Sequence, residues 1–333
     1  MSPVENFCSE MDPDFQTYNG KRIKLNYRIG KFLIKHSNSQ SSDTYKAPYN
    51  SHFAGEELWG MIQIIKKRPN VVFFPYADYN YNYTWLLKRV FGFKIVLYTF
   101  FSEDELQKRF KNLQHFEQAD LILVAGRGQL NYLQNILKNP TLKFFPLPLN
   151  TTFFHPGDTF IPFRIVQSGM NRRDFKTLFT ALDLLYTMYP YMKVEFIGCS
   201  AIQNIYKDRP YALFYGFLSD EEMLKVYQRA HLQLLIAKDG GSSNSLSEGL
   251  ACGLPMIVTR LNNLTDYIND QCCMFVEEGD FEQIVNCVSE IFGDDTLRKQ
   301  MAEASRRQAL NYSVNKLIKE FQIYIEELQK GSA

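Results

Sequence analysis

The sequence predicts an α/β protein of two tandem domains, each a doubly wound parallel sheet with helices on both faces. Helical and strand patterns alternate along the 333-residue chain from about residue 55. A segment rich in proline and turn-forming residues, 148–163, interrupts this alternation and is typical of an interdomain linker. The alternation then begins again. A chain of this length is long enough for two domains that each bury a core.

The first domain is expected to span residues 1–155. Its predicted strands are residues 71–76, 94–99, 120–125 and 143–147, and its predicted helices are 56–67, 83–91, 104–118 and 129–137. Each strand is a short apolar run of the kind found in parallel sheets covered on both faces. The helices show apolar residues at helical spacing.

The second domain is expected to span residues 156–312, with a last helix at 313–330. The predicted strands are 164–168, 193–197, 231–236, 256–259 and 273–276, and the predicted helices are 175–186, 219–229, 245–252, 281–292, 295–310 and 313–328. In such sheets ligands bind at the carboxyl ends of the strands.

Composition excludes several classes of protein. The net charge of +1 gives no reason to expect a nucleic-acid partner. Six cysteines without C-x-x-C spacing indicate reduced thiols and a cytoplasmic location. The acidic amino terminus lacks the apolar core of a signal peptide, and no apolar run is long enough to span a membrane. No cluster of His, Cys and Asp has metal-ligand spacing, so we expect no metal and no cofactor.

A basic stretch near the amino terminus has two interpretations. Residues 21–36 contain no acidic residue, and their cations are Lys21, Arg22, Lys24, Arg28, Lys31 and Lys35. The stretch could contact the inner face of a membrane peripherally, or an acidic acceptor. An edge strand or hairpin with solvated lysines is the alternative that we favour.

The stretch from Asp239 to Pro255, D-G-G-S-S-N-S-L-S-E-G-L-A-C-G-L-P, lies between two buried-strand patterns. A glycine-rich loop followed by a helix amino terminus directs free backbone N–H groups at an anion. Glu248, one turn into the helix, is placed to accept hydrogen bonds from sugar hydroxyls. Ser245 and Glu248 also form an S-x-x-E capping box, which is the purely structural alternative.

Several motifs in order resemble glycosyltransferase family 4. The segment G-G-S-S-N-S-L-S-E-G-L-A-C-G-L-P-M-I resembles that family's E-G-x-x-N-x-L-x-E-A-x-A-x-G-x-P-V-I. Upstream, P-L-P-L-N-T-T-F-F-H-P resembles I-P-N-G-V-D-x-x-x-F-x-P, and S-G-M-N-R-R-D-F-K occupies the place of G-R-x-x-x-x-K-G. The resemblance runs from about residue 55 to the end and is strongest in the second domain.

The resemblance implies a GT-B fold: two Rossmann-like domains face an interdomain cleft, and the C-terminal helix returns to the first domain. It implies a metal-independent, retaining glycosyltransferase that uses a nucleotide sugar (UDP-, GDP- or ADP-linked, with UDP expected first) and a glycan, lipid-linked or other hydroxyl acceptor. Arg173 takes the place of the family's phosphate-binding lysine, with Arg172 beside it. Glu248 is assigned to the ribose. The other nucleotide-sugar contacts implied are Gly240, Gly241, Ser243, Asn244, Ser245 and Leu246.

The sequence departs from the family pattern at three places. Gly240 stands where the family has the first of two glutamates, and Asp239 is the candidate that replaces it at the donor sugar. No histidine follows the strand at 94–99, and the first domain is short by about one strand–helix unit. These losses leave a second hypothesis: a catalytically silent protein that binds a nucleotide sugar or glycan and assists a partner. A nucleotide-sugar epimerase ranks third, because no acid/base pair is evident.

The segment from Tyr76 to Trp85, Y-A-D-Y-N-Y-N-Y-T-W, interleaves aromatic residues with asparagine after a strand of the first domain. Carbohydrate-binding surfaces use such side chains for stacking, which makes the segment a candidate acceptor surface. Tyrosine and tryptophan at a loop–helix junction more often serve packing, and that is the alternative.

Overall fold

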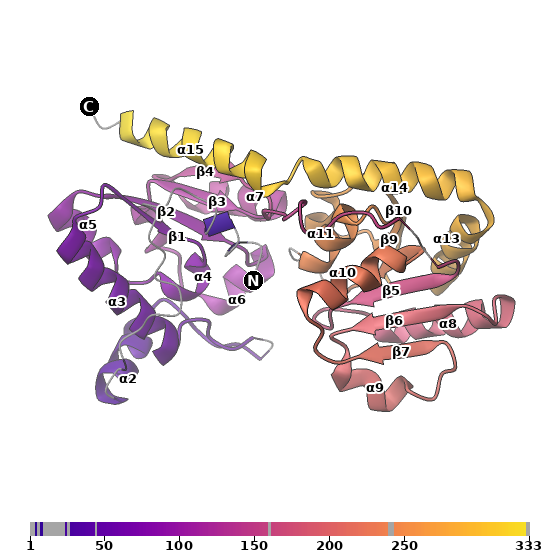
Figure 1. The fold of residues 1–333 in the computed structure, drawn as a ribbon. Coiled ribbons are helices and arrows are strands. Elements are labelled where there is room, and N and C mark those ends of the chain that lie inside the picture. Colours follow the sequence, from indigo (N-terminus) through magenta and orange to yellow (C-terminus); the bar gives the residue numbers. More distant parts are fainter. Residues whose placement is uncertain are drawn as a thin grey trace. The chain divides into compact units, whose positions relative to one another are not determined.

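The structure is a computed structural model that describes residues 4, 7–8, 24, 27–43, 45–158, 161–238 and 243–330. It divides the chain into two compact units (Figure 1). Unit 1 comprises residues 1–146 and 317–333, and unit 2 comprises residues 147–316.

Unit 1 contains a four-stranded parallel sheet in the order β1-β2-β3-β4. The strands are β1 (Val71–Phe74), β2 (Lys94–Thr99), β3 (Leu121–Val124) and β4 (Thr141–Phe144). The helices are α2 (Tyr27–His36), α3 (Ser51–Lys67), α4 (Ala77–Asn80), α5 (Trp85–Phe91), α6 (Glu103–Arg109), η1 (Phe116–Gln118) and α7 (Arg127–Ile136). All four strands that the sequence predicts are present, within a few residues of the expected bounds.

Both faces of the unit 1 sheet are covered. On one face Ile95 and Leu97 of β2 pack with Phe116 and Leu133 in a continuous core. On the other face lies the second part of α15 (Val314–Lys330), which begins in unit 2. Phe321 of this helix contacts the Phe73 ring at 4.9 Å between centroids. The C-terminal helix therefore returns to the first unit, as expected.

Residues 27–36 form helix α2, so the favoured edge strand or hairpin was wrong. The apolar positions explain the difference, because Gly30, Leu33 and Ile34 recur at helical rather than alternating spacing. Gly30 is buried, α2 contacts α3, and the carbonyl of Leu33 accepts a hydrogen bond from the Tyr83 hydroxyl at 2.6 Å. Lys21 and Arg22 lie outside the described residues.

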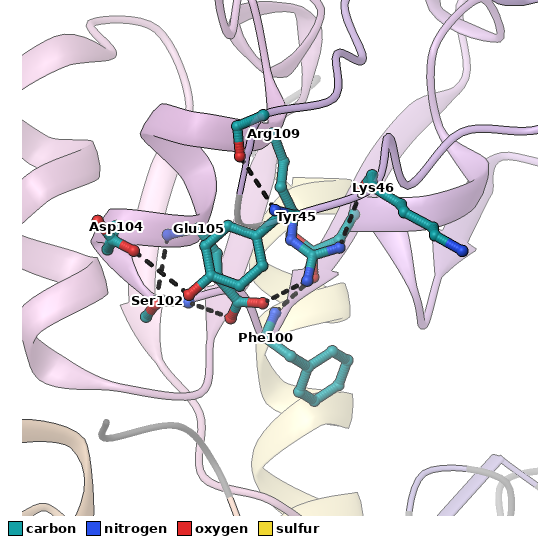
Figure 2. A network of polar contacts seen from close by, with 9 residues as sticks. Tyr45, Lys46, Phe100, Ser102, Asp104, Glu105 and Arg109 are labelled. Atoms are coloured by element: carbon teal, nitrogen blue, oxygen red, sulfur yellow. Dashed lines mark hydrogen bonds and ion pairs between the residues drawn. The ribbon is translucent and has the colours of Figure 1, made fainter. Parts of the chain in front are cut away.

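The segment before α3 is held by an arginine on α6 (Figure 2). The Arg109 guanidinium donates to Glu105 Oε1 at 2.9 Å and to the carbonyl of Lys46 at 3.2 Å. It also lies over the rings of Tyr45 and Phe101, at 4.4 and 4.5 Å from their centroids. Charge and stacking together fix this chain segment to α6.

A buried carboxylate organises the loop before α5. Glu57 Oε1 accepts three successive backbone N–H groups, those of Asn82, Tyr83 and Thr84, at 2.8, 2.6 and 2.8 Å. Its Oε2 accepts the Tyr49 hydroxyl at 2.7 Å. The carboxylate thus satisfies backbone donors that would otherwise be buried without partners.

Unit 2 contains a six-stranded parallel sheet in the order β10-β9-β8-β5-β6-β7. The strands are β5 (Arg164–Ser168), β6 (Lys193–Ile197), β7 (Ala212–Tyr215), β8 (Leu232–Leu235), β9 (Met256–Thr259) and β10 (Cys273–Val276). The helices are α8 (Phe175–Met188), α9 (Ser200–Tyr206), α10 (Asp220–Arg229), α11 (Asn244–Ala251), α12 (Asn262–Thr265), α13 (Phe281–Gly293) and α14 (Asp295–Leu310). Strand β7 and helix α9 were not predicted; β7 is a four-residue edge strand with only half-buried side chains.

Successive residues of β5 point to opposite faces of this sheet and to different helices. Ile165 packs in the core formed with α8 and α13 (Figure 1). Val166 packs with Val226 and Tyr227 of α10 on the other face. The unit is therefore doubly wound, as the alternating pattern predicts.

Replacing Glu57 by alanine is expected to destabilise the protein by about 3 kcal/mol or more, because buried N–H donors lose their acceptor. The matched control is Glu56→Ala on the same helix, where the carboxylate pairs with a partly exposed histidine, His52. That change should cost less than about 1 kcal/mol. Urea unfolding of the two variants gives the measurement, and equal losses of stability would contradict the role assigned to Glu57.

Candidate functional site

The candidate site lies at the carboxyl edge of the unit 2 sheet. Strands β5 and β8 are neighbours there, and the chain continues from β5 to β6 on the opposite side, so the strand order reverses at this point. The segments that follow the two strands meet: Arg173 and Ala237 form an isolated β-bridge, and the N–H of Lys238 donates to the carbonyl of Arg172 at 2.9 Å. Open α/β sheets bind ligands at such a reversal.

Arg173 turns back over the end of β5 toward α11. Its Nη2 donates to the hydroxyl of Ser245 at 2.8 Å, to that of Ser243 at 3.3 Å and to the carbonyl of Ser168 at 3.2 Å. Its Nη1 lies 3.4 Å from the carbonyl of Asn171, and its Nε is buried without a hydrogen-bond partner. The guanidinium is therefore held firmly, with a donor left unused.

Within the part of the chain that the structure describes, the hydrogen-bond partners of this guanidinium are all neutral. Two are hydroxyls and two are backbone carbonyls, and burial lowers the pKa of Arg173, although an arginine remains protonated. The cation also lies beside Ser243 and Ser245 at the amino end of α11, where the helix dipole is positive. A half-buried cation at a positive helix end is stabilised by an anion, so the site is built for one.

The backbone that carries the two arginines adopts two left-handed residues. Gly169 follows β5 with φ +78°, and Arg172 has φ +62°, which is costly for a side chain other than glycine. A Cβ atom at position 169 would lie 3.3 Å from Arg173 Nη2. Glycine is therefore required both for the turn and for the close approach of the guanidinium.

Helix α11 presents hydroxyls to the guanidinium and buries its apolar side chains. Ser243 is the N-cap residue, Asn244 is exposed and Leu246 is buried, so Leu246 can offer a ligand only its backbone. The hydroxyls of Ser243 and Ser245 are 2.9 Å apart. One hydroxyl proton lies between them, which leaves the other proton for a bound anion.

A glutamine of β8 supports α11 from below. The Nε2 of Gln233 donates to the carbonyl of Ser245 at 2.8 Å, and the residue is fully buried. Its Oε1 occupies the space where a Cβ atom at position 249 would lie, and the Met256 Cε atom would be 2.8 Å away from that Cβ. Gly249 thus allows the glutamine to reach the first turn of the helix.

Glu248 does not complete a capping box, so that alternative was wrong. The helix begins after Ser243 rather than Ser245, and Glu248 Oε2 accepts the hydroxyl of Tyr227 on α10 at 2.9 Å. Burial raises the pKa of Glu248 to about 7, while the hydrogen bond from Tyr227 opposes that rise and Asp220 adds to it. The carboxylate is therefore held by a side chain and is close to its titration point at neutral pH.

The remaining predicted positions of the loop, Asp239, Gly240 and Gly241, lie outside the described residues. The structure brings together Arg173, Ser243 and Ser245 directly, with the backbone of Arg172 next to them. Glu248 lies one helical turn further along α11.

Two residues at this edge were missed by the sequence analysis. Phe217 follows β7 and is fully exposed, at 101% of its reference area. The sequence could have indicated this residue, because an aromatic side chain stands in the G-F-L turn before α10, where packing does not require one. Tyr227 was missed because an internal helix tyrosine is indistinguishable from a core residue in one sequence.

The aromatic segment of unit 1 serves packing. Tyr81 is fully buried, the Tyr83 hydroxyl donates to the carbonyl of Leu33, and Trp85 Nε1 donates to the carbonyl of Asn82 at 2.9 Å. These contacts favour the packing alternative over a carbohydrate-stacking surface for this segment.

The described residues contain neither a metal-binding cluster nor a helix that could span a membrane. No group of three or more His, Cys, Asp or Glu side chains there is arranged to hold a metal ion. Within the same residues, every helix is too short or too polar to cross a membrane.

One family model matches part of the chain. Residues 172–308 match the family model for glycosyl transferases group 1, which covers the second unit's site. None of the curated proteins matches the sequence. The matched region begins at Arg172 and includes Arg173, α11 and Glu248.

Solved structures show the fold. Sucrose-phosphate synthase from Thermosynechococcus elongatus superposes with a TM-score of 0.69 at 15% identity, over 84% of this chain and 79% of that one. Anabaena HepE in complex with UDP and glucose gives 0.64 at 9% identity, over 81% of each chain. The pneumococcal O-GlcNAc transferase GtfA, with UDP and GlcNAc, gives 0.64 at 12%, over 83% of this chain and 60% of that one. The chain has the GT-B fold.

Gly169→Ala is expected to weaken binding of inorganic pyrophosphate to this site about tenfold, because the added Cβ displaces the Arg173 guanidinium. It should also lower stability by about 1 kcal/mol through backbone strain. Calorimetric titration and urea unfolding measure the two effects.

Gly198→Ala is the matched control for this prediction. Gly198 also has a left-handed φ of +68°, but a Cβ there meets no described atom within 4 Å. The control should lose similar stability and keep its pyrophosphate affinity. Equal affinities in the two variants would show that Arg173 does not bind the anion.

Proposed function

We propose that the protein is a retaining, metal-independent glycosyltransferase that moves a sugar from a nucleoside diphosphate sugar, most simply a UDP-sugar, to a glycan or lipid-linked hydroxyl. The observation that carries the proposal is the Arg173 guanidinium, which has only neutral hydrogen-bond partners among the described residues at the amino end of α11. A diphosphate leaving group gains negative charge in the transition state, and a fixed cation with helix N–H groups stabilises that charge.

In this proposal the nucleotide-sugar donor binds along the carboxyl edge of the unit 2 sheet. Its diphosphate lies at Arg173, Ser243 and Ser245, with Arg172 next to it and the backbone of Asn244 and Leu246 at the helix end. Glu248 accepts the ribose hydroxyls. HepE and GtfA, which share the fold, were solved with UDP, and this supports UDP as the nucleotide to test first.

Phe217 supplies a platform for the base. The loop after β7 is two strands from β5, on the order of 10 Å along the edge. The loop leads into α10, whose Asp220 is close enough to raise the pKa of Glu248. A fully exposed ring in the loop that leads into this helix is suited to stacking on a nucleobase. Phe217→Ala should therefore weaken UDP binding but not pyrophosphate binding in a titration of both.

Asp239, Gly240 and Gly241 are assigned to the donor sugar. The leaving phosphate itself takes the proton of the acceptor hydroxyl, so this mechanism needs no dedicated base. The second candidate function, a silent nucleotide-sugar or glycan binder that assists a partner, is favoured by one observation: glycine stands at position 240 in place of the first glutamate of the family pair.

The test is nucleotide release from UDP-, GDP- and ADP-sugars with an acceptor panel, with and without EDTA. Turnover that EDTA leaves unchanged is expected. Arg173→Ala should lower kcat/KM about 100-fold or more, because it removes the charge on the leaving group. Arg209→Ala, at the opposite edge of the same sheet before β7, is the control and should leave kcat/KM unchanged.

Other outcomes separate the candidates. Donor binding without turnover on any acceptor would favour the silent binder. Strict dependence on a divalent metal would contradict the metal-independent mechanism, and the absence of binding by any donor and by any glycan of the acceptor panel would contradict both candidates.

We also propose peripheral contact with the inner face of a membrane through α2. Ile29 and Phe32 are 53% and 61% exposed on this helix, and Lys31 and Lys35 are exposed beside them. The helix contains no acidic residue, so an apolar stripe flanked by cations is suited to an anionic lipid surface. The free thiols of Cys199, Cys252, Cys272 and Cys287 support a cytoplasmic location for the protein.

Phe32→Ser should reduce co-sedimentation with phosphatidylcholine vesicles that contain phosphatidylglycerol about tenfold, because a buried aromatic ring contributes roughly 1.5 kcal/mol or more. Val90→Ser on α5 removes a side chain that is 71% exposed elsewhere on unit 1 and is the control. Equal effects of the two changes, or equal binding to vesicles without the anionic lipid, would contradict this contact.

A further inference from the structure

Tyr227 is a buried tyrosine whose hydroxyl group ends at the candidate site. It lies on α10, none of its surface is exposed, and its hydroxyl donates to Glu248 Oε2 at 2.9 Å. A buried tyrosine hydroxyl requires a partner, and here the partner is the site carboxylate itself.

The ring of Tyr227 is fixed by packing. It lies in the core cluster with Val166 of β5, Cys252 and Leu254, and the Phe154 ring meets it edge-on at 6.3 Å between centroids. A tyrosine held in this way has one position for its hydroxyl. The carboxylate that bonds it is therefore also restricted to one orientation.

The two oxygens of Glu248 are not equivalent. Oε2 is engaged by Tyr227, whereas Oε1 makes no hydrogen bond with any part of the chain that the structure describes. Glu248 is only half-buried, so Oε1 can accept a hydrogen bond from a ligand at the end of α11.

We propose that Tyr227 is a positioning residue: its hydroxyl holds Oε2 of Glu248 so that Oε1 faces the ribose hydroxyls of the nucleotide. This inference rests on the proposed nucleotide-sugar function. It adds a residue that does not touch the ligand and acts through the carboxylate.

The charged and titratable groups around the pair give the expected pH dependence. Burial raises the pKa of Glu248 to about 7, Asp220 of α10 adds to the rise, and the hydrogen bond from Tyr227 opposes it. Arg173, in the segment after β5, interacts electrostatically with Tyr227. Cys252, the C-cap residue of α11, also interacts with both Tyr227 and Glu248.

The sign of the effect follows from these interactions. A carboxyl whose pKa is near 7 becomes an ionised acceptor as the pH rises through 7, so ribose recognition should strengthen in that direction. Loss of the Tyr227 hydroxyl raises the pKa of Glu248 further. The pH at which ribose recognition reaches half its maximum should then move upward.

The experiment compares UDP, 2′-deoxy-UDP and pyrophosphate by calorimetric titration between pH 5.5 and 9. The wild type should prefer UDP over its deoxy analogue, and Tyr227→Phe should reduce UDP affinity about tenfold at pH 7. Its preference for UDP over the analogue should largely disappear, with partial recovery at pH 9. Pyrophosphate affinity should stay unchanged, because that ligand has no ribose.

Tyr211→Phe is the matched control. Tyr211 is also buried in unit 2, and its hydroxyl also donates to a carboxylate, that of Asp183, at 2.5 Å, but it lies at the amino end of β7. This variant should lose comparable stability and keep the wild-type preference for UDP at every pH.

The possible outcomes distinguish the positioning role of Tyr227 from the proposed nucleotide-sugar function. If the wild type binds UDP and Tyr227→Phe keeps the wild-type preference and pH profile, the positioning role is overturned while the function stands. If Tyr211→Phe changes the preference equally, the effect is general destabilisation and the inference is again overturned. If the wild type binds none of UDP, GDP and ADP, the proposed function fails and the inference fails with it.

Discussion

The geometry of the site depends on one electrostatic arrangement, a guanidinium held against the positive end of a helix. Arg173 reaches Ser243 and Ser245 at the start of α11, and its hydrogen-bond partners among the described residues carry no charge. Like charges placed together in a protein interior cost free energy unless a third group neutralises them. In the proposed function this third group is the diphosphate of the donor, and the unliganded protein already carries the positive charge that would attract it.

The surrounding residues hold the Arg173 guanidinium in this position. The reversal of strand order brings the ends of β5 and β8 together, and the bridge between Arg173 and Ala237 joins the segments that follow them. Gly169 leaves room for the guanidinium, and Gln233 fixes the first turn of α11 from beneath. Each contact restricts the cation further, which lowers the reorganisation required on binding.

The sequence predicted the structure correctly where a single physical effect, such as burial of an apolar strand, determines the residue pattern. Strands such as β2, β5 and β8 are buried apolar runs. Helix α11 ends at Ala251, and Gly253, which follows its C-cap, has the left-handed φ of +70° that glycine allows after a helix. Prediction from the sequence failed where two patterns compete. The S-x-x-E spacing at Ser245 is typical of a capping box, but the packed hydroxyl of Tyr227 takes the glutamate instead, and no single sequence shows that a residue on α10 lies there. Half-buried β7 was missed because weak burial leaves little periodicity to detect. Helix α2 was misassigned although its apolar residues recur at helical spacing, because its many cations were read as solvated lysines of an edge strand.

The contact between Gln233 and Gly249 has a consequence for how this chain can vary among its relatives. Any side chain at 249 would occupy the volume of the Gln233 amide, and a shorter residue at 233 would leave the carbonyl of Ser245 without its donor. Neither position can drift alone without loss of packing or of a buried hydrogen bond. The residues at positions 233 and 249 should therefore covary. Homologues with alanine at position 249 should carry a residue smaller than glutamine at position 233, so that the pair distinguishes one group of homologues from another.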